Sequence, residues 1–171
     1  MGKQIGIIYG STTGNTERAA ELIAERLGSR AVLHNIADQG LDGIADYCVC
    51  IFGIPTWDYG ELQEDWEEFW EELKCQNLKG TPCALFGLGD QIGYGEWFLD
   101  AMGLLHDVLR DGGAKIYGQW PVDGYVFEAS KALTDDGCFF VGLALDDDVQ
   151  QGETQERVDR WLLQLQPLFE L

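Results

Sequence analysis

Short, continuously apolar segments alternate with longer amphipathic segments along most of this chain. The apolar segments lie at 5–9, 31–36, 47–53, 82–87 and 114–118, and the segments at 16–27, 61–74, 96–111 and 154–169 carry apolar residues at helical spacing. Continuously apolar strands are typical of sheets that are buried on both faces, and strand–helix alternation favours right-handed crossovers around a parallel sheet. The pattern therefore predicts an α/β fold with helices on both faces of one sheet.

The segment 120–138 interrupts this alternation. It contains two turn signals, Asp123-Gly124 and Asp136-Gly137, and a further apolar run follows it at 139–143. We interpret it as an insertion near 119–138 that splits the last strand of a five-stranded parallel sheet. A length of 171 residues without repeats or low-complexity linkers predicts a single domain over residues 1–171.

The chain is strongly acidic, with 30 Asp and Glu against 11 Lys and Arg and a formal net charge of −19. This charge repels the phosphates of nucleic acids and favours a basic protein partner. The sequence contains neither a long apolar run nor a recognisable targeting segment, so we expect a cytoplasmic protein without membrane insertion. The five cysteines form no CxxC pair and the two histidines lie far apart, which argues against a disulfide scaffold, an iron–sulfur centre or a metal site.

Three loops that follow predicted strands are candidates for a binding site, because ligands of open α/β sheets bind beyond the carboxyl ends of the strands. The first loop, Gly10 to Thr16, has four hydroxyls and two glycines directly before a helix. Backbone N–H groups and the helix dipole can hold a phosphate in such a loop. The loop matches neither the Walker A motif nor GxGxxG. An ordinary capped turn would explain only one of the hydroxyls.

The other two loops each carry aromatic residues outside any helical or strand pattern. Trp57 and Tyr59 lie in the segment 53–61, and Tyr94 lies among glycines in the segment 88–97. Each ring alone could simply cover the edge of the sheet. Beside a phosphate loop, the two together favour a planar ring held between Trp57 and Tyr94 and carrying a phosphate tail.

The sequences of these loops resemble those of long-chain flavodoxins, and the resemblance extends from Lys3 to Phe169. The aromatic loops look most like those of cyanobacterial and algal members, and the insertion is similar to the one that distinguishes long-chain from short-chain members. The segments that carry the resemblance are IYGSTTGNT at 8–16, PTW at 55–57, GEL at 60–62, FG at 86–87, GDQIGY at 89–94 and FVGLALD at 140–146.

The resemblance implies a flavodoxin-like three-layer sandwich with strand order 2-1-3-4-5. It also implies one non-covalent FMN and a low-potential one-electron carrier that uses the semiquinone/hydroquinone couple, without substrate turnover. The protein would be a monomer, and its partners would be ferredoxin-NADP reductase, photosystem I or another low-potential redox protein. The implied cofactor-binding residues are Ser11, Thr12, Thr13, Gly14, Asn15, Thr16, Thr56, Trp57, Asp58, Tyr59, Gly60, Leu88, Gly89, Asp90, Tyr94 and Asp146.

Three features depart from the family pattern. Asn15 stands at a position that is often basic in relatives, so a phosphate would depend more on backbone dipoles. Asp58 and Tyr59 follow the tryptophan where many members have Gly, Asn or an aliphatic residue, and a positive φ costs more for a non-Gly residue, although Asp tolerates it comparatively well. Trp97 and Leu99 replace polar residues that are common after the tyrosine loop.

Two other functions on related folds remain as alternatives. An FMN-dependent oxidoreductase of the quinone-reductase type would need an open flavin face, which Tyr94 is expected to cover. A receiver-type signalling module would give no reason for Trp57 and Tyr94. The carboxylates between Glu61 and Glu72 fit a solvated helix face and a docking surface equally well.

Overall fold

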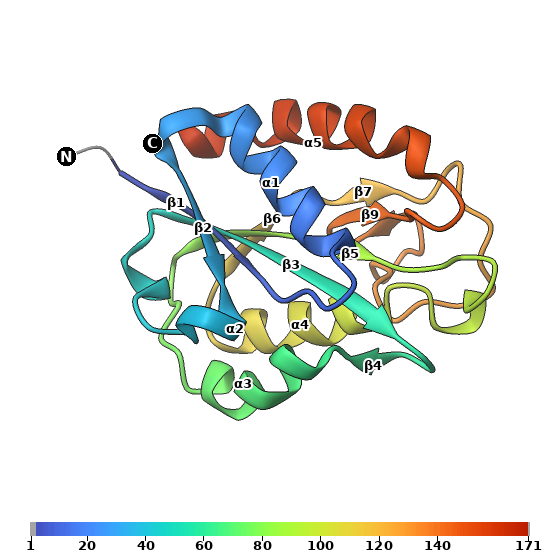
Figure 1. Cartoon of the computed structure of the whole chain (residues 1–171), viewed down its shortest axis with the longest axis horizontal. Coiled ribbons are helices and arrows are strands. Elements are labelled where there is room, and N and C mark those ends of the chain that lie inside the picture. The colour runs from blue at the N-terminus through green and yellow to red at the C-terminus, as the bar shows by residue number, and fades with distance from the viewer. Residues whose placement is uncertain (1–2, 171) are drawn as a thin grey trace.

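The computed structural model describes residues 3–170 and contains one central parallel sheet (Figure 1). Its strands are β2 (Ala31–Asn35), β1 (Ile5–Tyr9), β3 (Val49–Trp57), β5 (Pro82–Leu88) and β6 (Lys115–Tyr117), in this spatial order and all parallel. The residues of β1 are all buried, as their continuously apolar sequence predicts. The predicted strand order 2-1-3-4-5 is confirmed, with β5 and β6 as its fourth and fifth strands.

Helices cover both faces of the sheet. On one face, α1 (Asn15–Leu27) packs beside α5 (Thr154–Phe169), and on the other α2 (Ile36–Gln39), α3 (Glu64–Lys74) and α4 (Asp100–Asp111) lie side by side (Figure 1). The largest buried side chains are Trp66 in α3 and Trp161 in α5. Each indole N–H donates to a backbone carbonyl, Trp66 to Gly53 at 3.1 Å and Trp161 to Gly118 at 2.9 Å. Both large rings are therefore buried without an unsatisfied donor.

The fifth strand is split, as the sequence predicts. After β6 the chain leaves the sheet and returns as β9 (Leu143–Leu145), which also pairs with β5 in parallel. Between them, β7 (Trp120–Pro121) and β8 (Phe139–Phe140) form a small antiparallel pair. The apolar run 139–143 is thus divided between β8 and β9. Gly142, between them, lies so close to β5 that only a glycine fits, because a Cβ at this position would lie 2.3 Å from the carbonyl oxygen of Leu85.

Two helices begin later than their amphipathic patterns predict. The segment 53–61 continues β3 as far as Trp57 and turns back through β4 (Glu61–Leu62), so the helix that was expected from 61 begins at Glu64. The side chain of Gln63 accepts a hydrogen bond from Trp66 N and caps α3. In the segment expected as a helix over 96–111, a 3₁₀ turn at Gly95–Trp97 precedes α4.

The remaining elements are 3₁₀ turns at Gly28–Arg30, Ile44–Asp46 and Gln151–Glu153. All five cysteines are free thiols. Cys50 and Cys83 lie in the core, whereas Cys75 and Cys138 are exposed. Within residues 3–170, no helix is long and apolar enough to cross a membrane.

Candidate functional site

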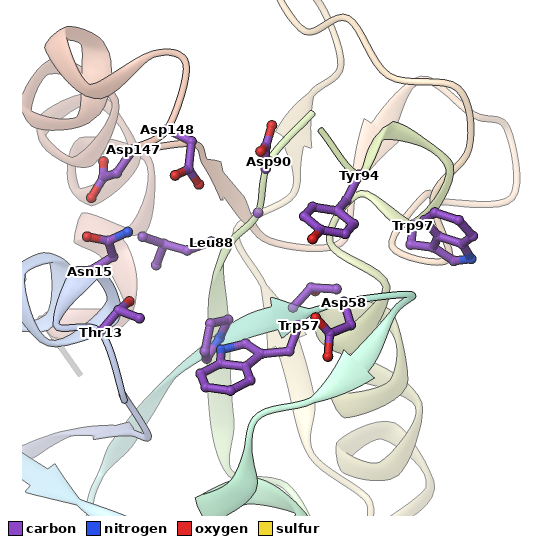
Figure 2. A pocket seen from close by; sticks show the side chains of 13 residues that line it. Thr13, Asn15, Trp57, Asp58, Leu88, Asp90, Tyr94, Trp97, Asp147 and Asp148 are labelled. Carbon is purple, nitrogen blue, oxygen red and sulfur yellow. The ribbon is translucent and has the colours of Figure 1, made fainter. Parts of the chain in front are cut away.

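A cleft of about 330 Å³ lies at the carboxyl ends of β1, β3, β5 and β9. Figure 2 shows the segments that meet there: the start of α1, the end of β3, the end of β5 with the loop that follows it, and the loop after β9. The lining residues that the sequence predicts are Thr13, Asn15, Thr56, Trp57, Asp58, Leu88, Gly89, Asp90 and Tyr94. Pro55, Trp97, Asp147 and Asp148 also line the cleft.

Trp57 and Tyr94 border the same space from different segments, β3 and the loop after β5 (Figure 2). Trp57 is fixed by the antiparallel pairing of β3 with β4, in which it faces Glu61. Tyr94 is anchored through its backbone N–H, which donates to the carbonyl of Asp90 at 3.0 Å, and its side chain remains 42% exposed. Two aromatic faces around an open space can stack against a flat ligand.

Tyr59 and Trp97 extend this aromatic surface outwards. The Tyr59 ring packs in a T-shaped arrangement with the Trp97 ring, at a centroid distance of 5.0 Å, and with the Tyr94 ring, at 6.5 Å. Tyr59 itself is 67% exposed and does not line the cleft. Trp97 does line it, so the residue that departs from the family pattern here gives the cleft an apolar wall instead of a polar contact.

The turn after Trp57 has an unusual backbone. Asp58 has φ 43° and Gly60 has φ 87°, so both lie in the left-handed region. Asp is among the residues that tolerate this region, which explains how the chain forms the turn without a glycine at position 58. Gly60, the last residue of this turn, does not line the cleft.

The loop before α1 and the start of the helix border one end of the cleft through Thr13 and Asn15. The Ser11 hydroxyl accepts hydrogen bonds from Gly14 N at 3.2 Å and from Glu17 N at 3.3 Å, and Gly14 enters the helix at φ 94°. Among residues 3–170, these bonds leave the N–H groups of Asn15 and Thr16 without a partner at the positive end of the helix dipole. This arrangement suits an anion.

The hydroxyls of this loop have different surroundings. Thr12 accepts a hydrogen bond from Gln63 Nε2 at 3.0 Å, and Thr16 is buried. Thr13 is exposed and lines the cleft. The guanidinium of Arg18 donates to the Asn15 side chain, so a cation from the next turn of α1 stands beside the residue that replaces a basic one.

One rim of the cleft is acidic. Asp147 and Asp148 follow β9 and line the cleft together with Asp90 (Figure 2). Burial raises the pKa of Asp148, and the charges of Asp90, Asp146 and Asp147 raise it further. A negative charge that is added inside the cleft therefore meets repulsion from this rim.

Asp146 lies beneath the cleft, where it is completely buried and does not belong to the lining. Its Oδ2 accepts from the backbone and side-chain N–H groups of Gln91, and its Oδ1 accepts from Asp148 N and Val149 N. The carboxylate therefore joins two loops. Within residues 3–170, no group of three or more His, Cys, Asp or Glu side chains is placed to hold a metal ion.

Sequence reasoning missed two glutamines that hold these loops, Gln63 and Gln91. Both are buried, and each joins a loop of the cleft to a distant segment. A glutamine beside a glycine-rich loop gives no periodic signal. The Asp146-Asp147-Asp148 run, in contrast, directly follows an apolar segment, and this position at the sheet edge was a usable signal for the two carboxylates that line the cleft.

Comparisons with known proteins identify the family. A family model described as "Flavodoxin" matches residues 7–161. Flavodoxin 2 of Escherichia coli K12 is 51% identical over 162 residues, covering 94% of each chain, and a flavodoxin of Klebsiella pneumoniae is 47% identical over 162 residues, covering 94% of this chain and 92% of the other. The crystal structure of Fusobacterium nucleatum flavodoxin bound to flavin mononucleotide superposes with a TM-score of 0.91 at 29% identity, covering 97% of this chain and 98% of that one. This chain belongs to the flavodoxin family.

Proposed function

We propose that the chain holds one FMN in the cleft described above and works as a low-potential one-electron carrier between redox partner proteins. Flavodoxins bind FMN and carry electrons, and they do not turn over a substrate. The observation that carries the proposal is the pairing of two features in one cleft. The Trp57 and Tyr94 rings border the space at one end, and Thr13 and Asn15, at the start of α1, border it at the other (Figure 2).

The residues of the cleft fit a flat ring with a phosphate tail. Trp57 and Tyr94 supply stacking surfaces, and Thr56, Gly89 and Asp90 bring backbone polar groups to the lining of the cleft, where the edges of a ring would lie. The start of α1 supplies N–H donors and a positive dipole end for a phosphate. Bound FMN would supply reversible one-electron chemistry, and the protein's part is to hold the ring, cover its faces and set its electrostatic surroundings.

The acidic surroundings support a low potential. Asp58, Asp90, Asp147 and Asp148 line the cleft, and the whole chain has a formal charge of −19. Each added electron brings a negative charge into this field, so reduction is disfavoured relative to FMN free in water.

We also propose that the partners are electropositive redox proteins, such as a ferredoxin-NADP reductase, photosystem I or another low-potential donor or acceptor. The support is the net charge and the exposed carboxylates on α3, namely Glu64, Glu67, Glu68, Glu71 and Glu72. Opposite charges speed encounter and make it sensitive to salt. The association rate with a basic reductase should therefore fall steeply as ionic strength rises, and a rate that is independent of salt would contradict this part of the proposal.

The insertion between β6 and β9 supports membership of the long-chain subtype. The two related sequences named above, from Escherichia coli and Klebsiella pneumoniae, are enterobacterial and give no support to a resemblance with cyanobacterial or algal members. One core cluster that includes residues of β1, β3, β5 and β9, with Ala31 of β2 and Ile116 of β6 packed against it, supports a single domain over residues 1–171. Five free thiols fit a reducing, cytoplasmic location.

An anaerobic reductive titration of the purified protein, reconstituted with FMN and followed by visible absorption, tests the function directly. A one-electron carrier should give a yellow protein that passes through an intermediate with new long-wavelength absorption before it bleaches. Bleaching in a single two-electron step would favour the quinone-reductase alternative. A protein that binds no added FMN would overturn both functions.

A further inference from the structure

Asp100 is a buried carboxylate that the proposed FMN site does not use. It is the first residue of α4, only 2% of it is exposed, and it does not line the cleft. Its Oδ1 accepts a hydrogen bond from Lys131 N at 2.7 Å, in the insertion. Burial raises the pKa of this carboxyl, while the hydrogen bond and the charge of Lys131 lower it. Burying a carboxyl group costs folding free energy unless its oxygens have partners, so the contacts of Asp100 need an explanation.

The other carboxylate oxygen lies against the turn that follows Trp57. A Cβ on Gly60 would be 2.8 Å from Asp100 Oδ2 and 3.3 Å from Trp97 Cδ1, so Asp100 and Trp97 leave room only for a glycine there. The neighbouring Ala101 N donates to Thr56 Oγ1 at 3.0 Å. The start of α4 therefore contacts both ends of the segment 56–60, whose Thr56, Trp57 and Asp58 line the cleft.

A strained backbone directs Asp100 towards this turn. Leu99 is completely buried and has φ 60°, in the left-handed region that a leucine rarely adopts. Its side chain packs against the end of β5, since a Cβ on Gly87 or Gly89 would lie 3.3 or 3.2 Å from Leu99 Cδ2. Strain of this kind persists only where the surroundings determine the conformation, and it is concentrated at functional sites.

From these contacts we infer that Asp100 is a positioning residue for the FMN site, which holds the turn Trp57–Gly60 in one conformation and thereby sets the potential of the bound flavin. The inference rests on the proposed FMN site. Hydrogen bonds and charges at the edge of a flavin ring determine its potential, and the segment 56–60 supplies part of that edge. A carboxylate locked between Gly60 and Lys131 N restricts how this segment can respond when the charge of the ring changes.

Asp100→Asn tests the inference, with Asp136→Asn as its matched control. Both substitutions remove one carboxylate that accepts a backbone N–H of the insertion, but Asp136 is exposed and bonds to Cys138 N. We expect Asp100→Asn to change the equilibrium constant that relates the two one-electron reduction steps of the bound flavin by at least about twofold, the smallest effect expected for residues in contact. Asp136→Asn should leave this constant unchanged. Equal effects of the two substitutions would overturn the inference. Failure of the unsubstituted protein to bind FMN would instead overturn the proposed function.

A double-mutant cycle separates the contact from a simple effect of charge. Gly60→Ala places a methyl group against Asp100 Oδ2, and Asp100→Ser removes that oxygen. If the contact positions the turn, the potential shifts of the two substitutions are not additive, and the double variant shifts less than their sum. Additive shifts would mean that Asp100 acts only through its charge, and would overturn the positioning role. The visible spectrum of each FMN-loaded variant verifies that it folds. If Asp100→Ser does not fold, the same cycle is run with Asp100→Asn in its place.

Discussion

Asp146 accepts hydrogen bonds from both the backbone N–H and the side-chain amide of Gln91, at 3.0 and 2.8 Å, although the two residues are 55 positions apart. Gln91 in turn accepts from Val126 N at 2.6 Å, so the tyrosine loop, the insertion and the loop after β9 meet at one buried pair. The carboxylate that the family resemblance assigned to cofactor binding thus holds the loops that border the cleft.

Asp146→Asn should lower both stability and FMN affinity. An asparagine has one acceptor oxygen, so one of the two pairs of donors around position 146 loses its partner. We expect a loss of about 2–4 kcal/mol in the free energy of unfolding, measured by urea denaturation. The exposed Asp135→Asn removes the same charge and should cost almost nothing. Equal costs for both would contradict the buried role of Asp146.

Tyr94→Leu should weaken FMN binding by roughly tenfold, the loss expected when an aromatic stacking face is removed. Tyr117→Leu is the matched control, because Tyr117 is also 42% exposed but lies on β6 outside the cleft. Quenching of FMN fluorescence measures both dissociation constants. If the two variants bind FMN equally well, Tyr94 does not cover the ring.

Arg18→Gln should weaken the binding of FMN but not of riboflavin, which lacks the phosphate. The guanidinium stands beside Asn15 at the start of α1, and its side chain is exposed, so we expect an effect of about threefold that disappears at high salt. Arg26→Gln, on the same helix but paired with Asp159, is the control. An equal loss for both ligands would place the effect of Arg18 on the ring and not on the phosphate.

The raised pKa of Asp100 predicts a pH-dependent difference between the wild-type protein and Asp100→Asn. The unfolded chain releases this proton near pH 3.8, whereas the folded protein retains it to a higher pH. The wild-type protein is therefore most stable relative to the variant below pH 3.8, and it loses this advantage as pH rises through the folded pKa. Urea unfolding at several pH values measures the difference in unfolding free energy between the two proteins. The carboxylates that both proteins share contribute equally and cancel in this difference. Parallel pH profiles would be inconsistent with a raised pKa.

Tyr125→Phe should cost about 1–3 kcal/mol of folding free energy. The Tyr125 hydroxyl donates to Ala144 O at 2.6 Å and accepts from Trp120 Nε1 at 2.9 Å, and burial raises its pKa to about 12. These bonds join the insertion to β9. Thermal or urea unfolding of the FMN-loaded protein measures the loss, and Tyr117→Phe, at an exposed position, should show none. An unchanged midpoint for Tyr125→Phe would show that the hydrogen bonds of this hydroxyl add nothing to the stability of the protein.

The sequence was sufficient to predict the sheet and its helices because their signals are periodic. The run Ile5–Tyr9 is continuously apolar and is buried throughout, and the two Asp-Gly pairs indicate the insertion. The three loops that border the cleft could also be predicted, since loops at the carboxyl ends of parallel strands must lie together, and the family resemblance added further lining residues such as Thr56, Leu88 and Gly89.

The details that were missed depend on tertiary contacts. The pattern of residues 61–74 is helical from its first residue, but pairing with β3 draws Glu61 and Leu62 into a strand. Leu99 has a positive φ, which leucine rarely adopts, and packing against β5 imposes this conformation. Asp146 and Asp148 are near neighbours in a run of identical residues, and only the fold decides which one is buried.

The split fifth strand also has a consequence for the order in which the protein folds. β6 follows α4 closely and can join β5 early, whereas β9 must wait until the whole insertion has closed as a loop. Because the two carboxylates of the acidic rim and the buried Asp146 directly follow β9, the cleft is completed only when this last strand docks. We therefore expect amide hydrogen exchange in the protein without FMN to be faster in β9 than in β1 or β3.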